Sequence, residues 1–247
     1  INAWCSIPSA VTAEMTSLND FDSITIDMQH GQTDYSASLP MLQALSSSQS
    51  TPMVRVPWSE PGIIMRMLDL GVLGIIAPMI NNKQDCEQFV SYCYYPPVGQ
   101  RSFGPMRAQL VHGSDYFSKA NENILSFAMI ETQEAVDNLD EILSVPSLTG
   151  VYIGPADMSV SYGMKPKFDV KEDPVFSNIK LIAKKVNEKG KIAGIHNGTT
   201  QYAKEMIDIG FKLVTISSDF RSMSAHAQSV IDDMKEKTKN SNSNEAY

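Results

Sequence analysis

The stretch SITIDMQHG, residues 23–31, joins a short strand to a loop that carries reactive side chains. Its first five residues are rich in Ile and Thr, and a helical pattern follows at residues 36–45. Most of the candidate strands in this chain are continuous apolar runs, which is typical of parallel strands buried on both faces. The stretch therefore predicts a strand–helix unit with Asp27 and His30 at the carboxyl end of the strand.

The same unit recurs along the chain. The other predicted strands are residues 3–7, 52–56, 74–77, 125–130, 150–153, 191–194 and 213–217. Helical patterns lie at residues 10–18, 36–45, 62–70, 84–92, 132–143, 175–189, 200–209 and 222–235. Eight strands, each followed by a helix, predict an α/β protein with a closed (β/α)8 TIM barrel. The alternative is an open doubly wound sheet, which normally carries GxGxxG in its first turn, and that motif does not occur.

The length of 247 residues suits one barrel, because about 250 residues is typical of that fold. We expect a single catalytic domain at residues 1–236 and a polar, disordered tail at residues 237–247. The connection at about residues 96–123 is unusually long. Long connections in barrels are usually lids or binding loops, so this one is expected to serve the site.

Composition excludes several classes of function. The formal net charge is −8 and no run of Lys and Arg exceeds two residues, so nucleic acid is not an expected partner. No apolar stretch approaches the roughly 20 residues of a membrane span. The three cysteines, Cys5, Cys86 and Cys93, lack paired metal-site spacing. They predict buried thiols in a cytoplasmic protein.

Two carboxylates follow neighbouring strands. Glu131 and Asp157 come at the ends of the strands at residues 125–130 and 150–153. Because active sites of barrels form at the carboxyl ends of the strands, these groups are expected to converge. Oxygen ligands of this type suit Mg²⁺, Mn²⁺ or a similar divalent ion. The alternative is that they cap helices or form an ion pair with Arg55.

Three further side chains are candidates for acid–base and electrostatic roles. A carboxylate beside an imidazole makes a general base, so Asp27 and His30 are candidates for that role. The alternative is a surface histidine with Asp27 capping the turn. Arg55 lies inside the apolar run MVRV, where it could stabilise a developing oxyanion or form a structural ion pair.

The tetrapeptide GPAD, residues 154–157, could present the backbone N–H groups of Ala156 and Asp157 to a substrate carboxylate. A Schiff-base aldolase would need a lysine in the pocket, but Lys191 and Lys212 precede their strands. The sequence therefore points to a metal as the electron sink.

Six sequence motifs occur in order along the chain. They are FDSITIDMQHG (21–31), MVRVPW (53–58), GVLGIIAPMI (71–80), YYPPVGQRSFG (94–104), MIETQEAVDNL (129–139) and VYIGPADMS (151–159). With them the chain resembles the HpcH/HpaI aldolases, which include 4-hydroxy-2-oxoheptanedioate aldolase and 2-dehydro-3-deoxyglucarate aldolase. The resemblance runs from about Trp4 to Met234. It departs from those aldolases at Gln29, Gly31, Met129 and residues 194–197.

The resemblance implies a barrel of the phosphoenolpyruvate/pyruvate-binding type that cleaves a 4-hydroxy-2-oxo acid to pyruvate and an aldehyde. It implies Glu131 and Asp157 as ligands of Mg²⁺, Mn²⁺ or Co²⁺, and His30 as the acid–base group supported by Asp27. Arg55 would stabilise the pyruvate enolate. Backbone groups of Gly154, Ala156 and Asp157 would bind the pyruvate carboxylate, and Arg101 would lie near the aldehyde.

Three alternatives stay open at this point. They are oxaloacetate decarboxylation, cleavage of an acyl-CoA thioester, and binding of a 2-oxo acid without catalysis. The resemblance also implies a homo-oligomer, a trimer or a hexamer built as a dimer of trimers, with the last helix exchanged between neighbours. Apolar side chains in the last helix, such as Phe220 and Val230, agree with an exchange. The alternative is that this helix packs on its own barrel.

Overall fold

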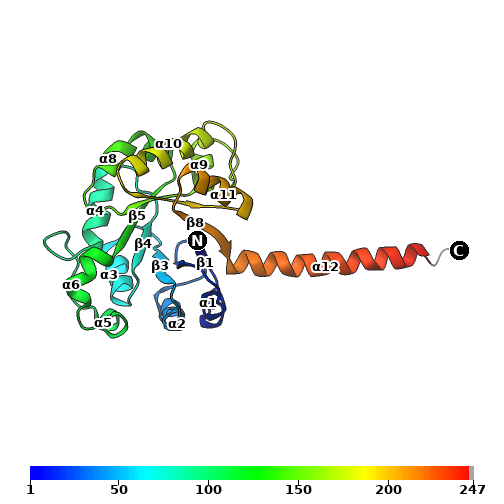
Figure 1. Ribbon diagram of the computed structural model, residues 1–247, viewed down its shortest axis with the longest axis horizontal. Helices are drawn as coiled ribbons and strands as arrows, with labels where there is room; N and C mark the ends of the chain where they lie inside the picture. The colour runs from blue at the N-terminus through cyan, green and yellow to red at the C-terminus, as the bar shows by residue number, and fades with distance from the viewer. Residues whose placement is uncertain (245–247) are drawn as a thin grey trace.

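The structure, a computed structural model, describes residues 1–244 and the side chains of residues 1–235. Eight parallel strands pair in chain order, and the eighth closes the barrel against the first (Figure 1). The predicted fold is therefore confirmed. The strands are β1 (Asn2–Cys5), β2 (Ser23–Asp27), β3 (Thr51–Arg55), β4 (Gly74–Ala77), β5 (Leu125–Ile130), β6 (Gly150–Ile153), β7 (Ile192–His196) and β8 (Leu213–Ser218).

Helices follow every strand. They are α1 (Ala10–Ser17), α2 (Tyr35–Leu45), α3 (Pro61–Asp69), α4 (Lys83–Cys93), α5 (Met106–His112), α6 (Tyr116–Asn123), α7 (Gln133–Asp137), α8 (Leu139–Leu143), α9 (Pro155–Ser161), α10 (Val175–Glu188), α11 (Thr200–Ile209) and α12 (Asp219–Asn244). The helix expected at residues 132–143 divides at Asn138 into two short ones. The extra helix α9 follows β6 directly, so it begins at the mouth of the barrel.

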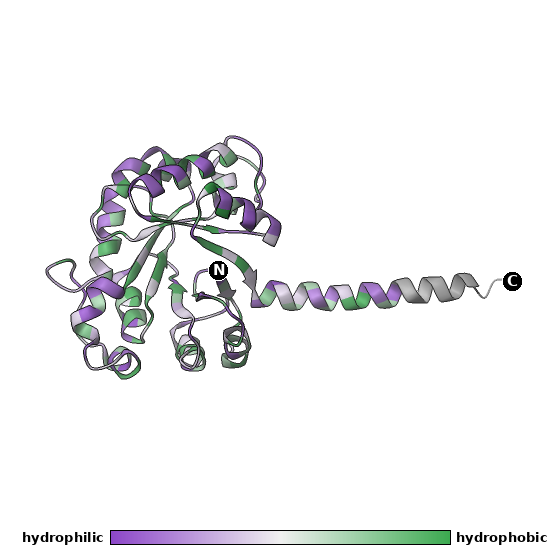
Figure 2. Ribbon diagram, viewed as in Figure 1, coloured by the Kyte–Doolittle hydropathy of each residue, from purple (hydrophilic) through white to green (hydrophobic). Residues whose placement is uncertain are grey.

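Two apolar layers hold the barrel together. The larger one lies between the strands and the surrounding helices, and it explains why the strands read as apolar runs (Figure 2). The smaller one fills the barrel itself and comprises Trp4, Met53, Ile76, Phe127, Met129 and Tyr152. The rings of Trp4 and Tyr152 stack with their centroids 5.7 Å apart. The interior is therefore a packed core that forms the floor of any pocket at the carboxyl ends of the strands.

The long connection between α4 and β5 lies at the base of the barrel, not over its mouth. Tyr95 and Tyr116 from this connection pack with Ala108, Ala120 and Leu73, the residue that precedes β4. Arg107 donates hydrogen bonds to main-chain carbonyls of Leu42 and Leu70 near the ends of α2 and α3. Because these helices end where the next strands begin, the connection covers the amino ends of the strands. The expectation that it serves this subunit's site as a lid or binding loop was therefore wrong.

The last helix, α12, extends away from the barrel (Figure 1). The side chains of residues 220–235 are all exposed, which includes Phe220 at 63% and Val230 at 48%. The helix continues to Asn244, further into the polar segment than the sequence predicts, and the end of the expected tail, residues 245–247, lies outside the described residues. Within residues 1–244 no helix is long and apolar enough to cross a membrane.

Candidate active site

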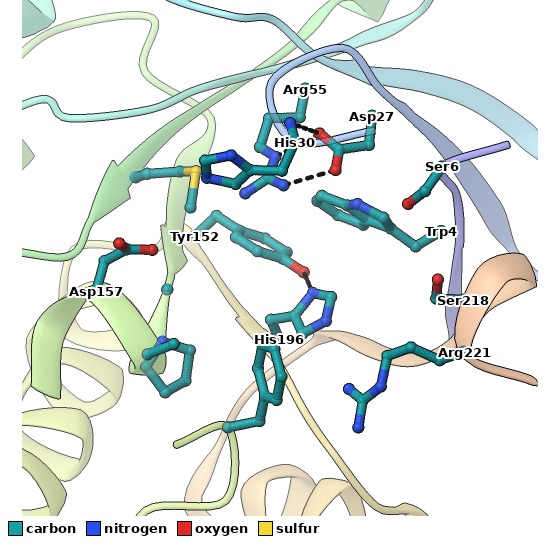
Figure 3. A pocket seen from close by; sticks show the side chains of 15 residues that line it. Trp4, Ser6, Asp27, His30, Arg55, Tyr152, Asp157, His196, Ser218 and Arg221 are labelled. Carbon is teal, nitrogen blue, oxygen red and sulfur yellow. Dashed lines mark hydrogen bonds and ion pairs between the residues drawn. The ribbon is translucent and has the colours of Figure 1, made fainter. Parts of the chain in front are cut away.

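A pocket of about 280 Å³ opens at the carboxyl ends of the strands. Its walls come from β1, β2, β3, β5, β6, β7, β8, α9 and the start of α12, so most of the barrel contributes. Figure 3 shows its labelled side chains. The lining residues are Trp4, Ser6, Asp27, His30, Arg55, Met129, Tyr152, Gly154, Pro155, Ala156, Asp157, Phe168, His196, Ser218 and Arg221. All the sequence-predicted site residues except Glu131 and Arg101 are among them.

Arg55 is held rigidly by Asp27. The Nε and one terminal nitrogen of Arg55 donate to the two carboxylate oxygens of Asp27 at 2.8 and 2.7 Å (Figure 3). The guanidinium carbon also lies 4.9 Å from the centre of the Trp4 ring. Burial would raise the pKa of the Asp27 carboxyl, but the hydrogen bonds and charge of Arg55 hold that pKa below its usual value. The charged pair therefore fixes the guanidinium at the pocket wall, and the other terminal nitrogen makes no hydrogen bond within the described chain.

His30 lies beside this pair but is not hydrogen-bonded through its imidazole to Asp27. Asp27 instead accepts hydrogen bonds from the backbone N–H groups of Gln29 and His30, at 3.1 and 3.4 Å. Both Asp27 oxygens are already occupied by Arg55, so the carboxylate supports Arg55 and the loop. The His30 side chain is exposed and lines the pocket, where a proton acceptor could reach a substrate.

Glu131 is buried next to the pocket. One carboxylate oxygen accepts the backbone N–H of Met79 at 2.8 Å, and Met79 has a φ of 57°, a strained value for a residue with a side chain. Burial and, to a smaller extent, the charge of Asp157 raise the pKa of Glu131 to about 7, against the Met79 hydrogen bond and the charge of Arg55, which lower it. A carboxyl group in this setting gains from a nearby cation.

The absence of a side chain at Gly154 leaves room for the Glu131 carboxylate. A Cβ atom at position 154 would lie 2.5 Å from the other carboxylate oxygen of Glu131, so glycine is required for this close approach. Gly154 precedes α9, and Ala156 and the exposed Asp157 form the adjacent wall of the pocket. The structure therefore brings Glu131 and the segment 154–157 together, as the sequence predicts.

These two carboxylates fit a divalent cation that keeps open positions. Among the described residues, no group of three or more His, Cys, Asp or Glu side chains could hold a metal ion. Mg²⁺ is commonly held by one or two carboxylates, with water and substrate oxygens as the remaining ligands. Glu131 with a raised pKa and the nearby charge of Asp157 match that pattern.

Arg101 does not reach this pocket. Its side chain is fully buried at the base of the barrel, where its terminal nitrogens donate to Asp69 at 2.7 Å and to the Tyr116 hydroxyl at 3.0 Å. Its guanidinium carbon lies 4.4 Å from the centre of the Tyr95 ring. Because the long connection returns to the base, Arg101 supports the packing of α3 with that connection, and the predicted place near the aldehyde was wrong for this subunit's pocket.

Several pocket residues had not been assigned from the sequence. Trp4 and Tyr152 look like ordinary core residues there, and Arg221 lies in a helix of no evident chemistry. Only His196, one of four histidines and located at the end of a predicted strand, gave a signal. Its Nδ1 lies 3.3 Å from the Tyr152 hydroxyl (Figure 3). That hydroxyl in turn lies 2.6 Å from the hydroxyl of Thr215.

The environment of His196 keeps its imidazole neutral. Burial, followed by the positive charges of Arg55 and Arg221, lowers its pKa to about 4. A neutral imidazole can donate or accept a hydrogen bond, depending on its tautomer. Among the residues whose side chains the structure describes, no lysine lines this pocket, and Lys191 instead donates to main-chain carbonyls of Val145 and Leu148. Within residues 1–235 the pocket therefore has no amine for Schiff-base chemistry.

Comparison with known proteins agrees with this geometry. The family model for HpcH/HpaI aldolase/citrate lyase matches residues 1–225. A hydroxypyruvate/pyruvate aldolase of Rhizorhabdus wittichii is 40% identical over 230 residues, 93% of this chain and 92% of that protein. A 5-keto-4-deoxy-D-glucarate aldolase of Escherichia coli is 31% identical over 95% of this chain and 92% of its own. A solved HpcH/HpaI aldolase/citrate lyase family protein of Burkholderia cenocepacia superposes with a TM-score of 0.88 at 26% identity, over 95% of this chain and 93% of that one.

Proposed function

Because this chain belongs to the HpcH/HpaI aldolase/citrate lyase family, we propose that its pocket cleaves a 4-hydroxy-2-oxo acid to pyruvate and an aldehyde. The predicted class, a carbon–carbon lyase of the aldolase type, is confirmed by relatives that match nearly the whole chain. The observation that supports the specific reaction is that a fixed cation, Arg55, lines the pocket while the buried carboxylate of Glu131 lies next to it. Such a site can bind an oxo acid and stabilise its enolate.

Each residue has a defined task in this reaction. Glu131 and Asp157 would hold a divalent ion, which supplies electrophilic stabilisation of the oxo acid when bound. Backbone groups of Gly154, Ala156 and Asp157 form the wall proposed to receive the substrate carboxylate, since this segment lines the pocket.

The bond-breaking step uses His30, in the loop after β2, and Arg55, at the end of β3. His30 accepts the proton of the 4-hydroxyl group as the C3–C4 bond breaks and the aldehyde forms. The electron pair of that bond passes to the 2-oxo oxygen, and Arg55 donates hydrogen bonds to the resulting enolate. Protonation at C3 then gives pyruvate. Asp27 acts through Arg55, because both of its oxygens bind that guanidinium.

One assay tests the reaction. The purified protein should release pyruvate from 4-hydroxy-2-oxo acids with Mg²⁺, Mn²⁺ or Co²⁺, and EDTA should abolish the release. Oxaloacetate is assayed in parallel, since its decarboxylation forms the same enolate without an aldehyde. Activity on oxaloacetate alone would replace aldol cleavage by decarboxylation. Binding of pyruvate with no turnover of any oxo acid would leave only a binding role.

The exposed helix α12 supports the proposed homo-oligomer, a trimer or a hexamer. Its apolar residues Phe220, Met223, Val230 and Ile231 are 48–63% exposed and do not pack on the same barrel. Beside its start, an apolar groove of about 390 Å³ includes Met15 and Phe21. Exchange of α12 between copies would bury these surfaces.

Truncation tests the assembly. A chain ending before Asp219 should be insoluble or dissociated, because Asp219 also accepts hydrogen bonds from the backbone N–H groups of Ser6 and Ile7. Removal of residues 238–247 alone should leave the assembly unchanged. Sedimentation of the full chain as a monomer at micromolar concentration would contradict the assembly. The three buried free thiols support the proposed cytoplasmic location.

A further inference from the structure

We propose that His196 is the base that removes a proton from C3 of bound pyruvate, and that hydrogen bonds through the barrel core fix its tautomer for this step. Tyr152, Thr215 and Asn2 form that chain of hydrogen bonds and are positioning residues. The inference rests on the proposed function and deepens it, because that reaction leaves the group that handles the C3 proton unassigned. In the addition direction the C3–H bond breaks, its proton passes to Nε2 of His196, and its electron pair forms the enolate. In the cleavage direction a proton from solvent reaches C3 through the same nitrogen.

His196 and Arg55 reach the pocket from opposite sides, because β7 and β3 face each other across the closed barrel. Trp4 contacts both: its ring centre lies 4.9 Å from the guanidinium carbon of Arg55 and 5.2 Å from the centre of the His196 ring. The three groups attached to C2 of pyruvate diverge in one plane. With the carboxylate at residues 154–157 and the oxo oxygen at Arg55, C3 is directed toward the third side, where Figure 3 shows His196.

The chain of hydrogen bonds begins at Asn2, which is fully buried at the amino end of β1. The Asn2 amide has two orientations, and the main-chain carbonyls of Ala3 and Ser23 decide between them because a carbonyl can only accept. The amide nitrogen lies on their side and donates to the carbonyls of Ser23 and Ala3 at 3.1 and 3.3 Å. The amide oxygen then faces Thr215 and accepts from its hydroxyl at 2.8 Å. Asn2 therefore takes the only hydrogen of the Thr215 hydroxyl.

This arrangement fixes the direction of each hydrogen bond up to the pocket. The hydroxyl oxygens of Tyr152 and Thr215 lie 2.6 Å apart, and Tyr152 is the donor because Thr215 has given its hydrogen to Asn2. The Tyr152 oxygen can then only accept at its other contact, 3.3 Å from Nδ1 of His196, so Nδ1 carries a hydrogen. Because the imidazole is neutral, Nε2 carries none. The chain therefore presents an unprotonated Nε2 to the pocket, which is the form that a base requires.

The surroundings hold the imidazole in place and leave Nε2 unused. The His196 ring packs against the rings of Trp4 and Phe168, with centroids 5.2 and 5.1 Å apart, and Nε2 makes no hydrogen bond within residues 1–235. Burial and neighbouring positive charges lower the pKa of His196, so Nε2 stays unprotonated at neutral pH. A weak base of this kind is sufficient where the site stabilises the enolate, as proposed for Arg55. His30 then handles the 4-hydroxyl proton and His196 the C3 proton.

The first test measures exchange of the C3 protons of pyruvate in deuterium oxide with Mg²⁺. His196→Gln should slow this exchange about 100-fold, because glutamine accepts a hydrogen bond but cannot hold the transferred proton. His112→Gln is the matched control and should exchange at the wild-type rate. The His112 imidazole contacts the Gly71 carbonyl at 2.8 Å and does not line the active-site pocket. Exchange at the wild-type rate in His196→Gln would overturn the inference.

The second test changes the chain without changing the pocket lining, because Thr215 is buried below it. Thr215→Val keeps the branched shape but removes the acceptor of the Tyr152 hydroxyl, which then donates to Nδ1 of His196. The imidazole hydrogen should move to Nε2, seen by nitrogen-15 NMR, and pyruvate proton exchange should fall about tenfold. Thr215→Ser should restore both the Nδ1–H tautomer and the rate of exchange.

Two results of the second test would also overturn the inference: an Nε2–H tautomer of His196 in the wild type, or equal rates of exchange in Thr215→Val and Thr215→Ser. The proposed function fails in a different way. A wild-type protein that neither exchanges pyruvate protons nor cleaves any 4-hydroxy-2-oxo acid would overturn the proposed function and this inference with it.

Discussion

The two ends of the barrel use arginine in opposite ways. At the base, Arg101 and Arg107 bind groups of the protein itself: a carboxylate and a tyrosine hydroxyl in one case, main-chain carbonyls and the Ser46 hydroxyl in the other. At the mouth, Arg55 binds one carboxylate and keeps a terminal nitrogen without a protein partner, and Arg221 makes no ion pair within residues 1–235.

The difference teaches how to distinguish structural from functional arginines. Burial does not separate them, since the side chains of Arg55 and Arg101 are exposed by only 11% and 0%. The terminal nitrogens do separate them: in Arg101 and Arg107 both bind groups of the protein, whereas Arg55 and Arg221 keep terminal nitrogens without a partner within residues 1–235 at the mouth. If this reasoning is correct, substitutions at the mouth should change chemistry and substitutions at the base should change stability.

The largest expected effect is at Arg55. Arg55→Lys should reduce the rate of pyruvate proton exchange in deuterium oxide by about 100-fold or more, because lysine keeps the charge but loses the fork that binds Asp27 and an enolate together. The thermal unfolding midpoint should stay close to that of the wild type. Exchange at the wild-type rate would remove Arg55 from the proposed mechanism.

The next largest effect is expected for metal binding by the carboxylates Glu131 and Asp157. Glu131→Gln and Asp157→Asn should each weaken Mn²⁺ binding by about tenfold to 100-fold, measured by electron paramagnetic resonance, because each removes an anionic ligand. Glu134→Gln, on α7, is the control, since this glutamate does not line the pocket. If either variant binds Mn²⁺ as tightly as the wild type, the residue that it replaces is not a metal ligand.

A smaller effect is expected at the base and in a different measurement. Arg101→Met should lower the free energy of unfolding by about 2 kcal/mol, because it leaves Asp69 and the Tyr116 hydroxyl without their partner. The activity of the folded protein should be preserved. A large loss of kcat at unchanged stability would contradict the contrast between the two ends.

The smallest effect is the pH dependence of stability at His196. Its folded pKa, about 4, lies below the ordinary value of 6.5, so below pH 6.5 the unfolded chain binds a proton that the folded chain does not. Stability should therefore fall as pH drops from 6.5 to 4. His196→Phe should reduce this fall by on the order of 1 kcal/mol. Chemical unfolding at several pH values measures the difference, and parallel curves for both proteins would contradict the assignment.

The sequence predicted much of the site for a simple geometric reason. Asp27, Arg55, Glu131 and Asp157 are far apart in the chain, but each lies at the carboxyl end of a predicted strand or within it. In a parallel barrel all of these ends lie on one face. Arg101 lacked this constraint, since a long connection can return to either end. Its motif indicated the family correctly but not the place of the side chain in this subunit.

The sequence by itself determined the barrel, because short apolar runs alternating with helical patterns require a parallel sheet covered on both faces, and eight such units without GxGxxG favour a closed barrel over an open doubly wound sheet. It also predicted that Asp27, Arg55, Glu131 and Asp157 lie near the mouth. Only the tertiary structure decided the partners: that Asp27 binds Arg55 and not the His30 imidazole, that Gly154 makes room for Glu131, and that Arg221 joins the pocket. Partners depend on distances between segments remote in sequence, and local periodicity contains no information about those distances.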